Sequence, residues 1–102
     1  MGKVRRVAID RNMTIYEAEP LKEILLNELR GAPEGVELDL YRVGEMDTAG
    51  FQLLVLAKNE SRRLGRDLSI VAHSAAVLDV IEFYNMLAFF GDPVVIAAEA
   101  AR

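Results

Sequence analysis

The sequence predicts an α/β fold, in which helices pack against one mixed or mostly parallel β-sheet of about four to five strands. Two observations support this prediction. Short segments with strand-like hydrophobic patterns alternate along the chain with longer segments whose hydrophobic residues recur at helical spacing. The chain has 102 residues, of which 52% are hydrophobic, and no internal repeat or linker is evident, so we expect one domain over residues 1–102.

The first part of the chain is expected to form a strand and a helix. Lys3–Ile9 has the weak alternation of a strand, and Met13–Ile15 is a candidate for a short second strand. Glu17–Arg30 places its hydrophobic residues on one helical stripe and turns its polar residues away. Pro20 is compatible with this helix because it falls in the first turn, where a backbone N–H has no helical partner. Residues 31–35, which contain Gly and Pro, then predict a turn.

The remainder of the chain continues this alternation. Val36–Tyr41 has the pattern of a strand with one buried face. A long amphipathic helix follows the loop at residues 42–46, and Gly65 is expected to end it. Ser74 is a favoured N-cap for a third helix, which Asn85 can end. The other predicted elements are strands at Leu68–Ala72 and Val94–Ile96 and an apolar segment at Met86–Phe90 that packs on the core.

The four residues Asp47-Thr48-Ala49-Gly50 mark the start of the long central helix. Asp47 is a favoured N-cap residue, because its carboxylate can accept a hydrogen bond from a free backbone N–H of the first turn. Thr48 then lies in that turn, where free N–H groups and the helix dipole favour negative charge, so its hydroxyl is a reasonable site for a phosphate. Taken alone, the four residues favour a plain helix cap over a phosphorylation site.

One face of the central helix is expected to be covered by the core. Gly50 on that face would allow the helix to approach the sheet closely. Phe51 and Val55 fall off this face, beside the polar Gln52 and Asn59. We therefore expect Phe51 and Val55 either to be incidentally exposed or to form a partner surface within two turns of the cap. The expected core face consists of Gly50, Leu53, Leu54, Ala57, Ser61 and Leu64.

The composition argues against several classes of function. The chain has 16 Asp and Glu against 12 Lys and Arg, and this acidic balance disfavours nucleic acid as a main partner. The cluster of Arg62, Arg63 and Arg66 fits a solvated helix C-terminus, where the helix dipole favours cations. No secretory signal is visible and the apolar runs are too short to span a bilayer, so we expect a cytoplasmic protein without direct membrane insertion.

Catalytic and metal sites have little support. The chain has no cysteine, so it lacks a thiolate nucleophile and sulfur ligands for a metal. His73, the only histidine, lies beside a predicted helix cap, where a structural or exposed role is favoured over catalysis. Asp39, Glu45 and Asp47 could gather at the carboxyl end of a strand, but no other metal ligands occur at motif spacing. We therefore expect a solvated acidic rim and no enzyme activity, cofactor or metal.

The order of these segments resembles a known family. The strand Val36–Leu40, followed by Met46–Leu54 (MDTAGFQLL), resembles the corresponding part of STAS domains, the module of anti-sigma factor antagonists and sulphate transporters. Met13–Ala18 resembles the segment that enters the first helix of the family, and Asn85–Leu87 falls where the family often has Gly-Leu. The likeness thus spans nearly the whole chain. Its D-[ST]-x-G motif is short and gains specificity from the preceding strand and from the matching order of elements.

The resemblance implies a non-enzymatic interaction domain with helices packed on a β-sheet. In anti-sigma factor antagonists of this kind, a partner kinase phosphorylates the Ser or Thr after the Asp of the motif, which is Thr48 here. The unphosphorylated form would bind an anti-sigma factor that is a serine kinase of the histidine-kinase-like ATPase type. That binding frees a sigma factor, and phosphorylation breaks the complex. The implied partner surface is the motif and the following helix, with Phe51, Gln52, Val55 and Asn59.

The D-T-A-G form, with Ala49 where many antagonists have a second Ser or Thr, is similar to one subgroup of the family. This subgroup includes small chemotaxis-cluster STAS proteins and MlaB, a subunit that binds the ATPase of a phospholipid ABC transporter and helps its assembly. The resemblance therefore implies two kinds of partner, an anti-sigma factor kinase or a transporter ATPase. Thr48 is central in both.

Overall fold

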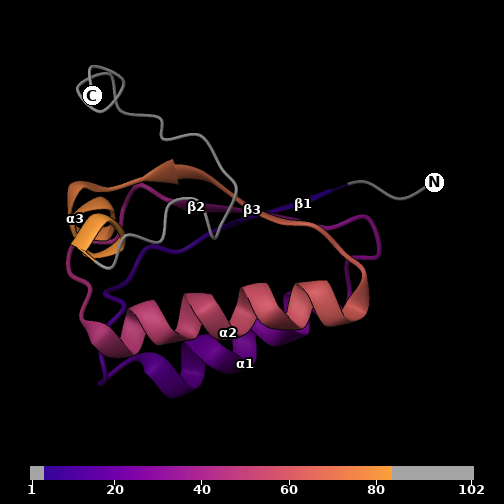
Figure 1. Cartoon of the computed structure of the whole chain (residues 1–102), viewed down its shortest axis with the longest axis horizontal. Helices are drawn as coiled ribbons and strands as arrows, with labels where there is room; N and C mark the ends of the chain where they lie inside the picture. The colour runs from indigo at the N-terminus through magenta and orange to yellow at the C-terminus, as the bar shows by residue number, and fades with distance from the viewer. Residues whose placement is uncertain (1–3, 84–102) are drawn as a thin grey trace.

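The computed structural model of the chain describes residues 4–83, in which three strands and three helices alternate (Figure 1). This alternation confirms the predicted α/β class. No helix in this part of the chain is long and apolar enough to cross a membrane. In chain order the elements are β1 (Arg5–Ala8), α1 (Ala18–Arg30), β2 (Val36–Leu40), α2 (Thr48–Leu64), β3 (Leu68–His73) and α3 (Ala75–Phe83).

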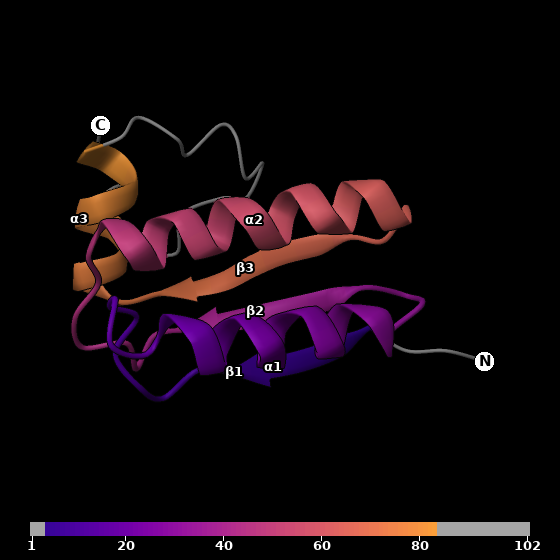
Figure 2. The ribbon, with the colours of Figure 1, turned by 90° about the horizontal axis from the view of Figure 1, so that it is seen from below.

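The three strands form a parallel sheet in the order β1-β2-β3. The helices α1 and α2 make the two crossover connections and lie together on one face of the sheet (Figure 1, Figure 2). Parallel strands joined in this way all end on the same side, so α1, α2 and α3 begin at one end of the molecule (Figure 2). We call it the carboxyl end. The opposite end, formed by residues 31–35 and 65–67, is called the closed end.

The strand count of four to five is not confirmed. Residues 4–83 contain three strands, and every strand pair among them is parallel. Met13–Ile15, expected as a short strand, forms only an isolated bridge between Met13 and Met46. The predictions at Asn85, Met86–Phe90 and Val94–Ile96 lie outside the described residues.

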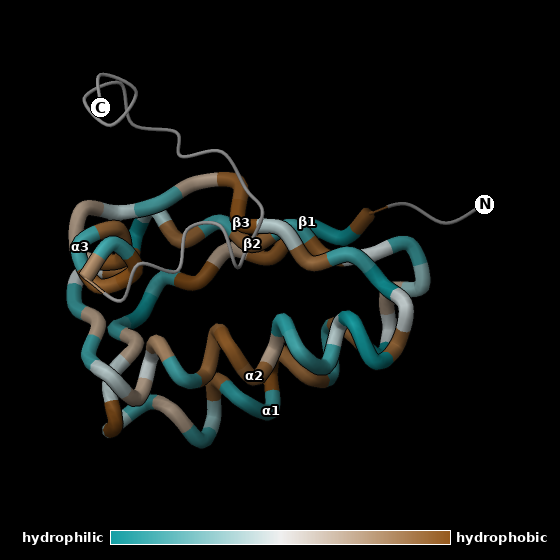
Figure 3. The backbone as a smooth tube through the Cα atoms, viewed as in Figure 1, coloured by the Kyte–Doolittle hydropathy of each residue, from teal (hydrophilic) through white to brown (hydrophobic). Residues whose placement is uncertain are grey.

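Hydrophobic residues from the helices and the central strand form the core. Every second residue of β2 is buried, with Val36, Leu38 and Leu40 inside, as its alternation predicts. Figure 3 shows the matching pattern on α1 and α2, along which hydrophobic and hydrophilic segments alternate. Full burial of each such side chain contributes roughly 1.5–3 kcal/mol. The main helical core residues are Leu21, Leu25 and Leu29 on α1 and Leu53, Leu54 and Ala57 on α2.

The closed end is held by backbone geometry and by one arginine. Gly65 has a φ of 69°, the left-handed conformation that ends α2 as predicted. Arg66 Nη1 donates to the carbonyl oxygens of the last two residues of α1, each at 2.6 Å. These carbonyl groups have no partner within their own helix, so Arg66 caps α1 from the turn after α2. The arginine cluster is therefore only partly solvated: Arg62 and Arg63 are exposed, whereas Arg66 joins the two helix ends.

Candidate functional site

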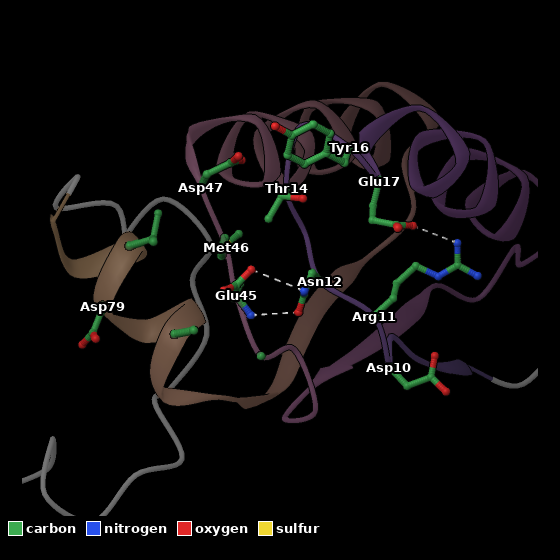
Figure 4. Close-up of a pocket in the computed structure, with 13 residues that line it drawn as sticks. Asp10, Arg11, Asn12, Thr14, Tyr16, Glu17, Glu45, Met46, Asp47 and Asp79 are labelled. Carbon is green, nitrogen blue, oxygen red and sulfur yellow. Dashed lines mark hydrogen bonds and ion pairs between the residues drawn. The ribbon is translucent and has the colours of Figure 1, made fainter.

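At the carboxyl end, the segment before α1 lies against the segment before α2. Met13 N donates to Glu45 O at 2.9 Å, and Asp47 N donates to Met13 O at 3.2 Å. The side chain of Asn12 continues the contact, because its Oδ1 accepts a hydrogen bond from Glu45 N at 3.1 Å (Figure 4). These bonds join parts of the chain that are more than 30 residues apart, and they fix the loop before α1 on the start of α2.

Asp47 holds both segments through one carboxylate. Its Oδ1 accepts a hydrogen bond from Gly50 N at 3.2 Å, which is the N-cap that the sequence predicts. Its Oδ2 accepts from Ile15 N at 3.0 Å, a contact with no local signal in the sequence. Because a side chain takes the Ile15 N–H, the backbone pairing of the two segments does not extend beyond the bridge at Met13. This explains why the predicted short strand does not form.

Gly50 is required by the close approach of the same segment. A Cβ atom at this position would lie 2.0 Å from Met13 O and 2.9 Å from Met13 C. These are backbone atoms, so a side chain at Gly50 would displace either the crossing segment or the first turn of α2. The expected reason for this glycine was contact with the sheet, and the observed neighbour is the Met13 backbone. Ala49, the residue before it, is half-buried.

Thr48 is the first residue of α2 and is exposed. It borders a shallow hollow of about 390 Å³, which we call the Thr48 hollow and which is also lined by Asp47, Asp79, Val80 and Phe83. The free N–H groups of a helix N-terminus favour an anion, so the isolated domain would tolerate a phosphate on this hydroxyl. The same phosphate would share the hollow with the carboxylates of Asp47 and Asp79.

A larger hollow of about 990 Å³ adjoins the Thr48 hollow and shares residues with it. It lies between residues 10–17, the loop at residues 44–47, and α3 (Figure 4). We call it the acidic groove, because five carboxylates and one guanidinium line it. Sequence reasoning missed most of these residues, since only the folded topology brings them together. The charged lining residues are Asp10, Arg11, Glu17, Glu45, Asp47 and Asp79.

The expectation that Phe51 lies off the core face is wrong. Its side chain is only 5% exposed and belongs to the core. The prediction assumed one covered stripe, whereas α2 contacts α1, β3 and α3, which widens its buried face (Figure 2). Val55 is half-buried and also packs against the core. Gln52 and Asn59 are exposed as expected, and Leu56, which was not predicted, is the most exposed large hydrophobic residue of α2.

The three acids that could have gathered at the end of β2 are each engaged separately. Asp39 pairs with Arg6 at 3.4 Å, Glu45 accepts from the side-chain amide of Asn12, and Asp47 caps α2. Across residues 4–83, no group of three or more His, Asp or Glu residues is placed to hold a metal ion. The acids therefore contribute charge to the surface at the carboxyl end.

The start of α3 follows the sequence prediction. Val77 N donates to Ser74 Oγ at 3.2 Å, so Ser74 is the N-cap. Val77 and Ile81 are buried and Val80 is half-buried. His73, the residue before the cap, is buried as well, so the exposed role considered for it is wrong and the structural role remains.

Comparisons with known proteins agree on the fold. Residues 2–90 match the model of a family described as MlaB, STAS domain. The structure resembles a crystal structure from Thermotoga maritima, of a protein provisionally named as an anti-sigma factor antagonist, with a TM-score of 0.75 and 18% identity. That match covers 99% of this chain and 90% of the other. A sulfate transporter family protein from Wolinella succinogenes has a TM-score of 0.71 and 19% identity, with coverage of 86% and 71%. No curated protein matches the sequence.

Proposed function

This chain belongs to the STAS domain family, and from that premise we propose that it is a non-enzymatic protein-interaction module of the anti-sigma factor antagonist type. In its unphosphorylated form it binds a serine kinase of the histidine-kinase-like ATPase type, which acts as an anti-sigma factor. Phosphorylation of Thr48 then releases that partner, so the module acts in the cytoplasm, where ATP is available. The observation that supports this proposal most directly is the exposed Thr48 at the border of the Thr48 hollow.

The geometry favours release over unfolding. A phosphate would add about −1.5 to −2 units of charge at the first turn of α2. In the free domain this charge is solvated and lies at a helix N-terminus, where it is tolerated. In a complex, the same dianion would lose its water while sharing the hollow with Asp47 and Asp79. Phosphorylation should therefore weaken the complex and leave the fold intact.

A second candidate function is favoured by the description of the matching family. In that reading the chain is an MlaB-like subunit. The family resemblance then implies that it binds the ATPase of a phospholipid ABC transporter, and we place that contact on the same surface. Thr48 would then be a contact residue without a cycle of phosphorylation. The two candidates predict different neighbours in the genome, a kinase and a sigma factor in the first and a permease and a transport ATPase in the second.

The direct test incubates the whole chain with its candidate kinase and ATP and determines the mass of the product. We expect one added phosphate on the wild type and none on Thr48→Ala. Thr14→Ala is the matched control, because Thr14 is the only other threonine and lines the acidic groove. A wild type that stays unmodified contradicts the switch for that kinase. A stable complex of the same unmodified chain with a transport ATPase would support the second candidate.

A further inference from the structure

The acidic groove carries the whole excess of negative charge in this chain. The sequence has 16 acidic and 12 basic side chains, a formal net charge of −4. The groove lining has five carboxylates and one guanidinium, which is also a net charge of −4. The rest of the chain therefore has 11 acidic and 11 basic side chains and is balanced. Clustered charge in a concave surface focuses the field and attracts a partner of opposite sign.

Three of the five carboxylates have roles within the fold, since Glu17, Glu45 and Asp47 bond to neighbouring side chains or cap a helix. Within residues 4–83, Asp10 and Asp79 have no such role. Asp10 follows β1 and Asp79 lies within α3, so neither caps a helix. Neither forms an ion pair with another residue in the range 4–83. They lie on opposite sides of the groove in Figure 4, with Glu45 between them.

Large apolar side chains border the same region. Tyr16, which lines the acidic groove, is 90% exposed, and Phe83, which lines the Thr48 hollow, is 81% exposed. Ile15, next to Tyr16, is 67% exposed. Exposed aromatic and aliphatic side chains that surround a hollow are typical of a protein-binding site, because their burial drives association. The carboxyl end thus combines an apolar rim with a strongly acidic groove.

We propose that this end of the molecule binds a partner segment in which Lys or Arg residues flank exposed apolar side chains. The apolar side chains pack on Tyr16, Ile15 and Phe83, and the cations lie in the groove near Asp10 and Asp79. This inference rests on the proposed function, that the chain is a protein-interaction module, and it adds the chemistry of the partner. Charge complementarity is its main support, since the groove holds all of the surplus charge.

Thr48 and Asp10 take separate parts in this arrangement. Thr48 borders the smaller hollow together with Val80 and Phe83, whereas Asp10 lines only the acidic groove. A phosphate on Thr48 would therefore occupy the space that the apolar side chains of the partner need. The cations near Asp10 determine which partner binds, and the state of Thr48 determines whether it stays.

The test selects peptides from a random library displayed on phage against the whole unphosphorylated chain. We expect the recovered peptides to be enriched in Lys or Arg next to Leu, Ile or Phe. Their binding to the double variant Asp10→Asn/Asp79→Asn should be weaker by about 3- to 10-fold, because two exposed charge pairs are lost. Raising the salt concentration should weaken binding to the wild type more than binding to this variant. Tyr16→Ser should reduce binding at every salt concentration.

The matched control is Glu23→Gln/Glu34→Gln, which removes two exposed acids outside the groove and should leave binding unchanged. Thermal unfolding of each variant separates lost binding from lost folding. The proposal would be overturned if no peptide binds, or if the recovered peptides carry no surplus of Lys or Arg. It would also be overturned if the groove variant binds the peptides as tightly as the wild type does. A dimer of the chain that forms at high concentration and is lost in the groove variant would overturn it as well. The assay uses only unphosphorylated chain and no kinase, so its outcome does not depend on whether any kinase modifies Thr48.

Discussion

The closed end and the carboxyl end both consist of segments that join strands to helices, but their side chains are used differently. At the closed end, Gly65 ends α2, and the side chain of Arg66 donates to the last carbonyl groups of α1. At the carboxyl end, Asp47 fixes the backbone, while Asp79 and Tyr16 line the acidic groove outside it. Sites of α/β proteins usually lie at the carboxyl ends of parallel strands. The difference fits our proposal that one end serves stability and the other recognition.

The carboxyl end itself has an inner and an outer layer. The inner layer consists of Met13, Asp47 and Gly50, whose backbone and carboxylate contacts hold the two segments together. The outer layer consists of the exposed side chains around the acidic groove and the Thr48 hollow. Substitutions in the inner layer should lower stability and disturb recognition together, whereas substitutions in the outer layer should affect recognition alone.

The largest expected effect is that of Phe51→Ala, because this side chain is buried in the core behind Thr48. Removing a buried aromatic side chain should lower the free energy of unfolding by about 3–5 kcal/mol, measured by urea denaturation. Gln52→Ala, on the exposed side of the same turn, should change it by less than about 0.5 kcal/mol. A Phe51→Ala variant that keeps its stability and loses partner binding would place Phe51 on the partner surface after all.

The second test makes the same substitution at both ends. Gly50→Ala should lower the free energy of unfolding by about 3 kcal/mol, because the new Cβ collides with the Met13 backbone. Gly65→Ala should cost only about 1 kcal/mol, since no atom lies within 4 Å of a Cβ there and the loss comes from the left-handed conformation. If urea denaturation shows that both variants lose the same free energy of unfolding, the backbone around Gly50 accommodates a Cβ atom without an added cost.

The third test compares the two polar groups that join separate segments. Asp47→Ala should lower the free energy of unfolding by about 1–2 kcal/mol, because it removes the helix cap and the partner of Ile15 N–H. Asp47→Asn retains one acceptor oxygen, so its free energy of unfolding should lie between those of Asp47→Ala and the wild type. Arg66→Met should lower the free energy of unfolding by about 1 kcal/mol and leave partner binding unchanged. If Arg66→Met loses partner binding, the closed end also takes part in recognition, and the proposed difference between the two ends is wrong.

The smallest expected effect is that of the pair formed by half-buried Glu60 and exposed Arg63 on α2. The hydrogen bond from Arg63, together with its charge and that of Arg30, holds the pKa of Glu60 below its ordinary value of 4.5. The pair therefore stabilises the fold above that pH, and its contribution is lost as the pH falls through the lowered pKa. Arg63→Gln should be barely less stable than wild type at neutral pH in low salt, and equal to it in acid. Thermal unfolding that shows a growing difference on acidification would contradict this assignment.

The sequence predicts those parts of the fold that depend on neighbours along the chain. The alternation of β2, the caps at Asp47 and Ser74, and the glycine at the end of α2 are all confirmed. Each depends on residues within a few positions of one another, so local patterns contain the information. The role of Thr48 was predicted through a family resemblance as well as through its position next to a cap, and it stays a prediction.

The sequence does not predict contacts between distant segments. Phe51 was misplaced because the number of elements around α2 cannot be read from α2 itself. The second bond of Asp47, to Ile15, has a partner 32 residues away and leaves no periodic signal. The acidic groove likewise depends on Asp10 and Asp79, which come from opposite ends of the described chain. Such features emerge only when the order and the direction of the strands are known.

The bond between Asp47 and Ile15 has a consequence for any partner of this protein. A peptide that contains Thr48 and the rest of α2 carries the local sequence, but it lacks the crossing segment and α3. The proposed recognition surface is thus a conformational epitope. It is assembled only after α2 and α3 have been synthesised and have packed with a loop made much earlier. A kinase or ATPase that recognises this epitope would bind the folded protein and would not bind nascent or unfolded chains.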